Sequence, residues 1–199
     1  KHLSTRLHDI HADTKLRYPH LHHQQISPLQ AHFLAFLIGL VKPKKILELG
    51  SFCGYSAALF RDAAPQAKVH CVERDSGVCE VLRVNVPEAI VHNTTCRNFL
   101  QQTATAMRGD SNWEPFDFCF VDADKRGYAE YGELVRGVMR DKSIVVYDNV
   151  LFRDTVYSDE QQSDIARSLR SFLDHKLAQG DSVLLPAFDG LLLEQINMQ

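Results

Sequence analysis

Acidic and basic side chains stand close together directly behind two apolar runs of the sequence. The segment FVDADKRGY, residues 120–128, places two acids and a lysine after a strand-like stretch: Asp122, Asp124 and Lys125. A second apolar run, SIVVY, ends just before Asp148 and Asn149. Together with Asp122, these residues offer two carboxylates and an amide carbonyl, a set of hard oxygen ligands without His or Cys. Such a set suits Mg²⁺ first, with Mn²⁺ or Ca²⁺ as alternatives, and zinc poorly.

The positions of these residues depend on the elements before them. From about residue 44 onward, short β-type runs alternate with helical patterns, which predicts a parallel sheet with helices on both faces. The predicted strands are residues 45–49, 67–73, 89–92, 116–122, 143–148, 182–186 and 191–196. Open α/β sheets bind ligands at the carboxyl ends of strands, where Asp122 and Asp148 fall. If their two strands are neighbours, the oxygens converge and fill half of an octahedron, which leaves places for a chelating substrate.

A glycine-bearing turn follows the first predicted strand. The segment ILELGSFCGYS, residues 46–56, runs through Gly50 and Gly54 into a helix, so the backbone can turn tightly beside a ligand. The spacing is G-x-x-x-G, whereas a dinucleotide site uses G-x-G-x-x-G to hold a pyrophosphate. Glu73 ends the next strand, 19 positions beyond Gly54, where an acid can accept both hydroxyls of a ribose. The combination indicates an adenosine group without a diphosphate.

Helix starts are marked by two capping boxes, Ser27 with Gln30 and Ser158 with Gln161. Apolar residues at helical spacing predict further helix over 128–139 and in the stretch 165–173. Residues 1–26 predict an N-terminal segment of helix and loop over the sheet. Its histidines match no metal-ligand spacing, and we expect them at the surface or in a lid: His8, His11, His20, His22 and His23.

Several segments resemble motifs of one enzyme family, the cation-dependent O-methyltransferases, which contains catechol O-methyltransferase and the plant caffeoyl-coenzyme A enzymes. ELGSFCGYS resembles the family's S-adenosylmethionine loop, FVDADKRGY its strand-four motif, VVYDNVLFRD its strand-five motif and LPAFDGLLLEQ its closing hairpin. ISPLQAHFLAFLIGLV is similar to the helix before the first strand, so the resemblance covers roughly residues 26–196. It implies a Rossmann-like class I methyltransferase fold, an α/β architecture with a mostly parallel seven-stranded sheet, a C-terminal antiparallel hairpin and helices on both faces. It also implies a single methyltransferase domain over residues 1–199, with 1–26 as an N-terminal cap segment.

The resemblance further implies which residues contact S-adenosylmethionine. Those of the glycine turn and the following helix start are Glu48, Gly50, Ser51, Phe52, Tyr55 and Ser56. The ring of Phe52 or Tyr55 could lie close to the sulfonium, and Glu73 would hold the ribose.

Other contacts implied by the resemblance come from later segments. The loop after the third strand reaches the adenine ring in this family, and here Cys96 and Arg97 take the later places of NTTCRN. The family's usual glycine is absent from that loop. Asp122 would line the cofactor site as well as bind metal, and Asp124 faces either the cofactor or the solvent.

The chemistry that this relation implies follows from charge. A phenol has a pKa of about 10 and is a poor nucleophile at neutral pH, and coordination to a divalent cation lowers that pKa. Lys125, beside Asp122, is placed to take the departing proton as general base, because a nearby dication disfavours its ammonium form. The oxyanion then attacks the sulfonium methyl in line. We therefore predict metal-dependent methyl transfer from S-adenosylmethionine to a hydroxyl of a small vicinal-dihydroxy, catechol-like aromatic.

Bulk properties exclude other classes. A chain of 199 residues, 45% hydrophobic and 24% charged, fits one globular core. The net charge of -3 creates no field that attracts a polyanion, so neither nucleic acid nor an anionic membrane is expected as partner. The longest apolar stretch, residues 33–41, is shorter than the roughly 20 residues of a membrane span. The five cysteines show no C-x-x-C spacing and read as reduced thiols, which favours the cytoplasm. The family relation allows a monomer or a homodimer.

Two other functions stay open at this point. An NAD-type dehydrogenase would use a similar α/β fold, although the missing middle glycine disfavours it. A non-catalytic protein that kept the fold would bind ligands and give no turnover.

Overall fold

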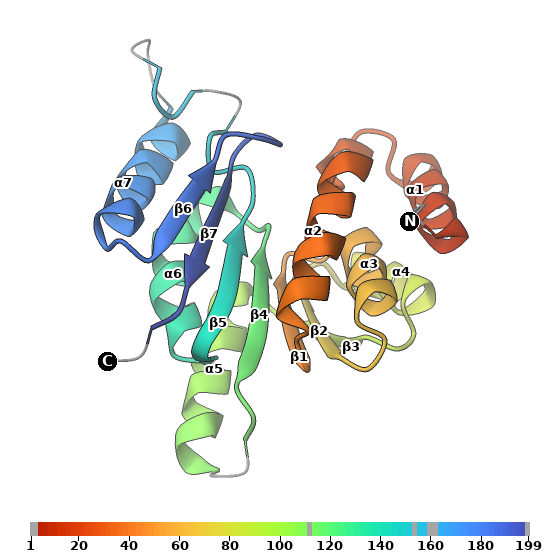
Figure 1. Cartoon of the computed structure of the whole chain (residues 1–199). Coiled ribbons are helices and arrows are strands. Elements are labelled where there is room, and N and C mark those ends of the chain that lie inside the picture. Colours follow the sequence, from red (N-terminus) through yellow and green to blue (C-terminus); the bar gives the residue numbers. More distant parts are fainter. Residues whose placement is uncertain (1–3, 111–112, 153–154, 159–162, 198–199) are drawn as a thin grey trace. The chain divides into compact units, whose positions relative to one another are not determined.

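Two compact units, residues 1–95 and 96–199, make up the chain in its computed structural model (Figure 1). The structure describes residues 4–110, 113–152, 155–158 and 163–197. No helix formed by these residues combines the length and the apolar character that crossing a membrane requires. The single methyltransferase domain over residues 1–199 stays a prediction.

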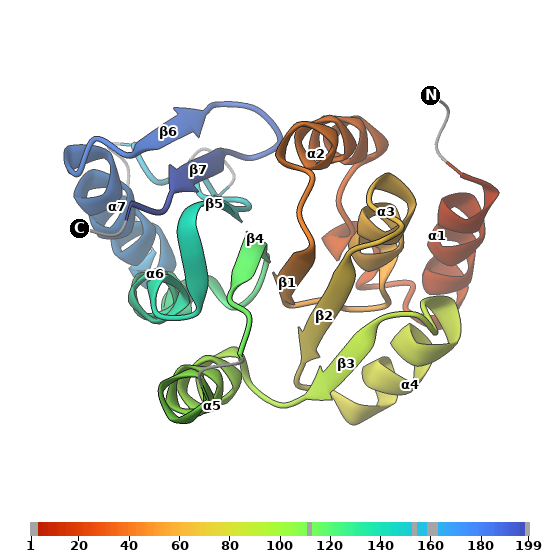
Figure 2. The same cartoon turned by 60° about the horizontal axis from the view of Figure 1, so that its bottom comes forward.

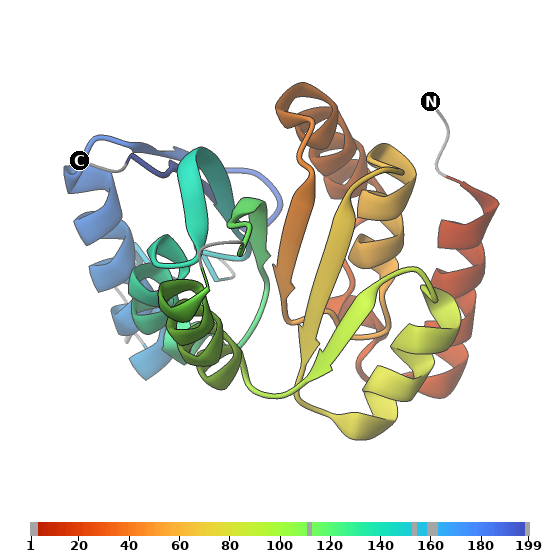
Figure 3. The same ribbon diagram turned by 90° about the horizontal axis from the view of Figure 1, so that it is seen from below.

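In its described residues, the first unit holds three parallel strands in the order β3-β2-β1. They are β1 (Lys45–Leu49), β2 (Lys68–Glu73) and β3 (Ile90–Asn93). The helices are α1 (Thr5–Arg17), the short 3-10 helix η1 (His22–Gln24), α2 (Pro28–Val41), α3 (Tyr55–Ala63) and α4 (Ser76–Asn85). Helix α3 lies between the strands and α1, and α2 also packs against α3 (Figure 3). The N-terminal segment thus consists of helix and loop, and its helix contacts α3.

The described part of the second unit holds four strands in the order β4-β5-β7-β6. Strands β4 (Phe116–Val121) and β5 (Met139–Tyr147) are parallel, whereas β7 (Leu191–Gln195) runs antiparallel to both β5 and β6 (Ser182–Leu185). The helices are α5 (Cys96–Gly109), the 3-10 helix η2 (Lys125–Gly127), α6 (Tyr128–Arg136) and α7 (Asp164–Ala178). Helix α6 packs against α5 and α7, and Figure 2 shows these three helices on one side of the strands.

The predicted fold class is confirmed: the strands are mostly parallel, and the last two form an antiparallel hairpin. All seven predicted strands form, but β5 begins at Met139, earlier than predicted. The helix predicted over 128–139 is therefore too long, because it ends at Arg136. Gly137, a poor helix former, follows, and the apolar Met139 is buried in the sheet instead. None of the five cysteines forms a disulfide, and all but Cys96 are buried.

One of the two predicted helix caps is correct. The Ser27 hydroxyl accepts a hydrogen bond from the N–H of Gln30 over 3.2 Å, and Pro28 occupies the first helical position. The other prediction is wrong, because α7 begins at Asp164 and is capped by Ser163, whose hydroxyl accepts from the N–H of Ala166 over 3.1 Å. An acid in the first turn also interacts favourably with the helix dipole. Ser158 lies before this helix, and Gln161 lies outside the described residues.

A charged cluster is buried in the second unit. Glu194 on β7 has no exposed surface, and it accepts hydrogen bonds from Lys176 of α7 over 2.8 Å and from the Tyr147 hydroxyl over 2.9 Å. Arg136 of α6 donates to the same carboxylate. Removing one partner of such a cluster leaves an uncompensated buried charge and costs about 3–5 kcal/mol. The cluster therefore fixes β7 against the helices α6 and α7.

Two histidines on adjacent strands of the first unit stack on each other. His70 on β2 and His92 on β3 have ring centroids 5.3 Å apart, and His70 Nδ1 lies 3.0 Å from His92 Nε2. Burial lowers the pKa of His70 from 6.5 to about 3, and the positive charge of Lys45 acts in the same direction. Burial also lowers the pKa of His92. The folded chain therefore resists protonation of this pair.

Acidification should destabilise the protein through His70. Between pH 6.5 and about 3, the unfolded chain binds a proton at this residue and the folded chain does not, so stability falls as the pH falls. Between pH 7 and pH 5 this residue should account for a loss of at most about 2 kcal/mol, measured by urea unfolding at each pH. The loss should be smaller in His70→Gln and smaller still when His92→Gln is added. An equal loss in wild type and His70→Gln would show that the pair does not couple folding to pH.

Candidate active site

The two acids predicted as metal ligands follow neighbouring strands. Strands β4 and β5 pair in parallel, with Val121 opposite Tyr147, so Asp122 and Asp148 leave the sheet at the same edge. The N–H of Asp148 also donates to the carbonyl of Val121 over 2.9 Å. The two strands that carry the predicted ligands are therefore neighbours within the second unit. Metal binding itself stays a prediction.

The chain turns sharply after β5. Asp148 is 2% exposed, and its Oδ1 accepts a hydrogen bond from the N–H of Asn149 over 2.7 Å. Asn149 has a φ of 53°, in the left-handed region, which Asn tolerates better than most residues because its short polar side chain bonds locally. The turn places the backbone N–H of Asn149 directly beside the buried carboxylate of Asp148.

Lys125 is held by two oxygen atoms. Its Nζ lies 2.7 Å from Asp122 Oδ1 and 2.8 Å from the hydroxyl of Tyr128, and the side chains of the ion pair are only 13% and 18% exposed. Asp124 has a different local task, because its Oδ1 accepts from the N–H of Arg126 over 3.2 Å and so caps the 3-10 helix η2. Its predicted contact with the cofactor stays a prediction.

The glycine turn of the first unit requires left-handed backbone. Gly50 and Gly54 have φ values of 88° and 89°, and Phe52 between them has a φ of 44°. The N–H of Gly50 donates to the carbonyl of Val72 on β2 over 3.0 Å, and that of Gly54 to the carbonyl of Ser51 over 3.0 Å. A Cβ on Gly54 would lie 2.4 Å from Leu82 Cδ1, so side-chain packing also demands glycine there.

Glu73 stands at the end of β2 and contacts this turn. Its Oε2 accepts from the N–H of Phe52 over 3.1 Å, and its Oε1 accepts from the N–H of Asp75 over 2.9 Å. A carboxylate offers about four lone-pair positions, so each oxygen can accept one more hydrogen bond. The side chain is half-buried at the surface of the unit. Glu73 can therefore accept hydrogen bonds from the two hydroxyls of a ribose while its existing hydrogen bonds fix the turn.

The other predicted residues of the turn are mostly covered. Glu48 on β1 is fully buried, Ser51 is 2% exposed and Tyr55 is 5% exposed, whereas Ser56 in the first turn of α3 is half-buried. Buried hydroxyl and carboxylate oxygens beside a glycine turn are suited to the ammonium and carboxylate groups of an amino acid. Their predicted contacts with the methionine end of the cofactor remain predictions.

The N-terminal segment packs over the same turn. The ring centroid of Tyr18 lies 5.5 Å from that of Phe52, and the ring centroid of His11 lies 6.2 Å from that of Tyr55. No pattern in the sequence indicated these two contacts, because both residues lie far along the chain from the turn. Of the histidines predicted at the surface, His22 is half-buried and the following are exposed: His8, His11, His20 and His23.

Cys96 and Arg97 begin helix α5 in the second unit. Cys96 is half-buried, and the exposed Arg97 donates from Nε to Glu130 Oε2 over 2.9 Å. An arginine already paired with a surface carboxylate offers fewer donors to a cofactor. Its predicted adenine contact therefore requires this pair to rearrange, and it stays a prediction.

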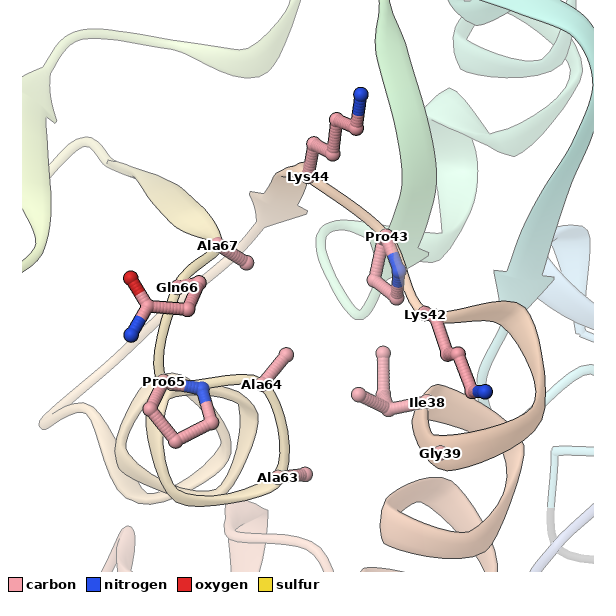
Figure 4. Close-up of a pocket in the computed structure, with 10 residues that line it drawn as sticks. All are labelled: Ile38, Gly39, Lys42, Pro43, Lys44, Ala63, Ala64, Pro65, Gln66 and Ala67. Carbon is pink, nitrogen blue, oxygen red and sulfur yellow. The ribbon is translucent and has the colours of Figure 1, made fainter.

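A surface cavity of about 390 Å³ lies elsewhere in the first unit (Figure 4). Its walls are the end of α2, the Pro43–Lys44 turn before β1 and residues 63–67 before β2. The cavity is thus at the amino ends of these strands, while the glycine turn and Glu73 follow their carboxyl ends. Ligands of open α/β sheets bind at the carboxyl ends, so this cavity is separate from the cofactor turn.

The fold of the chain is that of methyltransferases. An SAH-bound methyltransferase from Podospora anserina superposes with a TM-score of 0.84 at 23% identity, over 98% of this chain and 89% of that one. An O-methyltransferase from Bacillus cereus in complex with SAH gives a TM-score of 0.81 at 22% identity, over 98% and 92% of the two chains.

The sequence itself matches the O-methyltransferase family over residues 2–195, and the chain belongs to this family. The caffeoyl-CoA O-methyltransferase of Populus kitakamiensis is 29% identical over 83% of this chain and 71% of that protein. That of Stellaria longipes is 32% identical over 68% and 58%, and the catechol O-methyltransferase of Niastella koreensis is 29% identical over 84% and 80%. The predicted enzyme class, an S-adenosylmethionine-dependent O-methyltransferase, is therefore confirmed.

Replacement of Gly54 should disturb the cofactor turn. Gly54→Ala forces an L side chain into left-handed backbone and against Leu82, so we expect a loss of roughly 1–3 kcal/mol in stability and weaker S-adenosylmethionine binding. Gly39→Ala is the matched control, because a Cβ added there in helix α2 would meet nothing within 4 Å beyond its chain neighbours and the backbone of its own helix. The control should gain up to about 1 kcal/mol and bind cofactor normally. Thermal unfolding and calorimetric titration measure both effects, and equal behaviour of the two variants would contradict the role of Gly54.

Proposed function

We propose that the protein transfers the methyl group of S-adenosylmethionine to a hydroxyl oxygen of a small vicinal-dihydroxy aromatic, in a reaction that needs a divalent cation. The observation that carries the proposal is the pair of acids at the ends of adjacent parallel strands, with a lysine bonded to one of them. Family membership supplies the reaction class, and the acids supply the reason for a cation and a chelating acceptor.

The donor set fits a hard cation. Asp122, Asp148 and Asn149 would hold it through two carboxylates and an amide oxygen, with no sulfur or imidazole ligand among them. Asp148 is 2% exposed, and a bound cation would help to offset the cost of burying its carboxylate. When bound, the cation would orient both acceptor hydroxyls and lower the pKa of the one that reacts. Mg²⁺ is the first choice and Mn²⁺ or Ca²⁺ the alternatives.

Lys125 acts as general base in this proposal. Its Nζ stands beside Asp122, where it can take the proton of the acceptor hydroxyl and share it with that carboxylate. Asp122 thus has two tasks, as a ligand of the cation and as the partner that orients the lysine. The contacts of Asp122 and of Tyr128 fix the position of the Nζ before the substrate enters.

The first unit holds the methyl donor in this proposal. Glu73 accepts the ribose hydroxyls, the Gly50–Gly54 turn receives the methionine end, and the ring of Phe52 or Tyr55 lies near the sulfonium, whose positive charge an aromatic face attracts. Cys96 and Arg97 are the further contacts in this proposal near the adenine ring, and Asp124 is another residue that would face the cofactor. The protein's contribution to the transfer is mainly to hold the sulfonium and the acceptor oxygen in line.

The acceptor class is argued from the oxygen ligands and from the relatives. A cation held by three protein oxygens retains positions for two neighbouring substrate oxygens, which a catechol-like ring provides. Relatives are named for caffeoyl-CoA and catechol as acceptors, which is consistent with an aromatic hydroxyl here. A NAD-type dehydrogenase finds no support in the family match.

A methyl-transfer screen tests the proposal as a whole. Catechol-type acceptors should be methylated with S-adenosylmethionine in the presence of Mg²⁺, and EDTA should stop the reaction until Mg²⁺ is restored, because the acceptor depends on the cation for ionisation and orientation. Monohydroxy analogues serve as controls and should react far more slowly. Full activity in EDTA would remove the cation from the mechanism, and no turnover with any divalent ion would favour a non-catalytic protein.

Loss of Asp148 separates the cation from the cofactor. Asp148→Ala should weaken Mn²⁺ binding by roughly 100-fold or more and abolish metal-dependent turnover, while S-adenosylmethionine affinity changes little. Electron paramagnetic resonance of Mn²⁺ and calorimetry measure the two affinities. Asp117→Ala, which removes a carboxylate paired with Arg140 over 3.2 Å at the other end of β4, is the control. An unchanged Mn²⁺ affinity in Asp148→Ala would exclude this residue from the ligand set.

A further inference from the structure

The hydroxyl of Tyr128 lies at the meeting point of the lysine and both strand ends. It is 2.8 Å from Lys125 Nζ, 3.0 Å from the carbonyl oxygen of Val121 and 2.8 Å from the carbonyl oxygen of Asp148. The residue is 1% exposed. This one buried oxygen atom therefore contacts the end of β4, the residue that follows β5 and the side chain of Lys125.

Hydrogen-bond chemistry assigns a direction to these contacts. A phenol carries one proton, which it donates to one of the two carbonyls, and its lone pairs accept from Lys125. The ammonium or amine of Lys125 is thereby given a second fixed partner beyond Asp122. Burial, together with the negative charges of Asp122 and Asp148, raises the pKa of Tyr128 well above its ordinary value, so the hydroxyl keeps its proton.

The ring is held as firmly as the hydroxyl. Its centroid lies 6.0 Å from that of Tyr147 and 5.9 Å from that of Phe172, both in the core of the second unit. Tyr128 is also the first residue of α6 and directly follows the 3-10 helix η2 that begins at Lys125, so the two residues are three positions apart along one short turn. The packed ring therefore fixes the place of the hydroxyl that contacts the lysine.

We propose that Tyr128 is a positioning residue of the active site, whose hydroxyl sets the location of Lys125 and holds together the strand ends that carry Asp122 and Asp148. This inference rests on the proposed function for its catalytic consequence. Lys125 Nζ contacts the Asp122 carboxylate and the Tyr128 hydroxyl. Removal of the hydroxyl leaves the carboxylate as the remaining one of these two contacts. It also takes away the O–H donor that lies within reach of the carbonyls of both Val121 and Asp148, so the two strand ends lose a shared contact.

Tyr128→Phe tests the proposal, because it removes the oxygen and keeps the packed ring. The matched control is Tyr147→Phe. Tyr147 packs its ring against that of Tyr128 and is also fully buried, but its hydroxyl donates to Glu194 over 2.9 Å. Both variants should lose thermal stability. Outer-shell partners of ligands typically change metal affinity or activity by about 10–100-fold, so Mn²⁺ affinity and kcat should fall in this range in Tyr128→Phe alone. The affinity for S-adenosylmethionine should stay within about twofold of wild type in both.

A second measurement follows Lys125 without any turnover. Acetylation of Lys125 by acetic anhydride, measured by mass spectrometry, should be several-fold faster in Tyr128→Phe than in wild type or Tyr147→Phe, because the freed amine samples more solvent. In a Lys125→Ala background, Tyr128→Phe should lower kcat less than it does with the lysine present. Equal Mn²⁺ affinity, kcat and labelling in Tyr128→Phe and Tyr147→Phe would overturn the inference.

The outcome is separable from that of the proposed function. Absence of Mn²⁺ binding and of methyl transfer in the wild-type protein would end the proposed function, while the labelling rates would still decide whether Tyr128 orders Lys125. Normal wild-type activity with no difference between the two tyrosine variants would end the positioning role alone.

Discussion

The parallel pairing of β4 with β5 is the constraint on which the candidate active site depends. An acid directly follows each strand, and the register that sets Val121 opposite Tyr147 brings both acids to one edge of the sheet. A slip of one residue would move one acid by about 3.3 Å along the strand and turn its side chain to the other face. The N–H of Asp148 and the hydroxyl of Tyr128, both bonded at these strand ends, oppose such a slip.

Two of the charged groups in the second unit include buried carboxylates. Near the strand ends, Lys125 pairs with Asp122, and the buried Asp148 follows the neighbouring strand. Deeper in the unit, Glu194 is matched by Lys176 and Arg136, so its charge is compensated within the protein. The two groups differ in their partners: the first pairs one carboxylate with one cation at the strand ends, whereas the second pairs one buried carboxylate with two cations and fixes β7.

The sequence was sufficient to predict seven strands and to place Asp122 and Asp148 directly after two of them, because both depend on local patterns, although β5 begins earlier than predicted. Apolar runs followed by acids located Asp122 and Asp148 at strand ends, and the Ser27 cap followed from its immediate neighbours. Ser163 was missed, since a nearby serine offered the same cap. The tasks of Tyr128 and Glu194 could not be predicted, because their partners come from elements that only the folded topology brings together, and a tyrosine or a glutamate in an apolar pattern resembles an ordinary core or strand residue.

The hairpin formed by β6 and β7 has a consequence for how the protein is made. Strand β5 ends at Tyr147 and its outer neighbour β7 begins at Leu191, 44 residues later (191 − 147). At about 5–20 residues per second, a ribosome needs some seconds to supply that missing neighbour. During this interval the nascent β5 carries an open edge, a template for wrong pairing. The pairing of β5 is complete only when β7 has been translated up to Gln195, whereas the three described strands of the first unit are synthesised by Asn93.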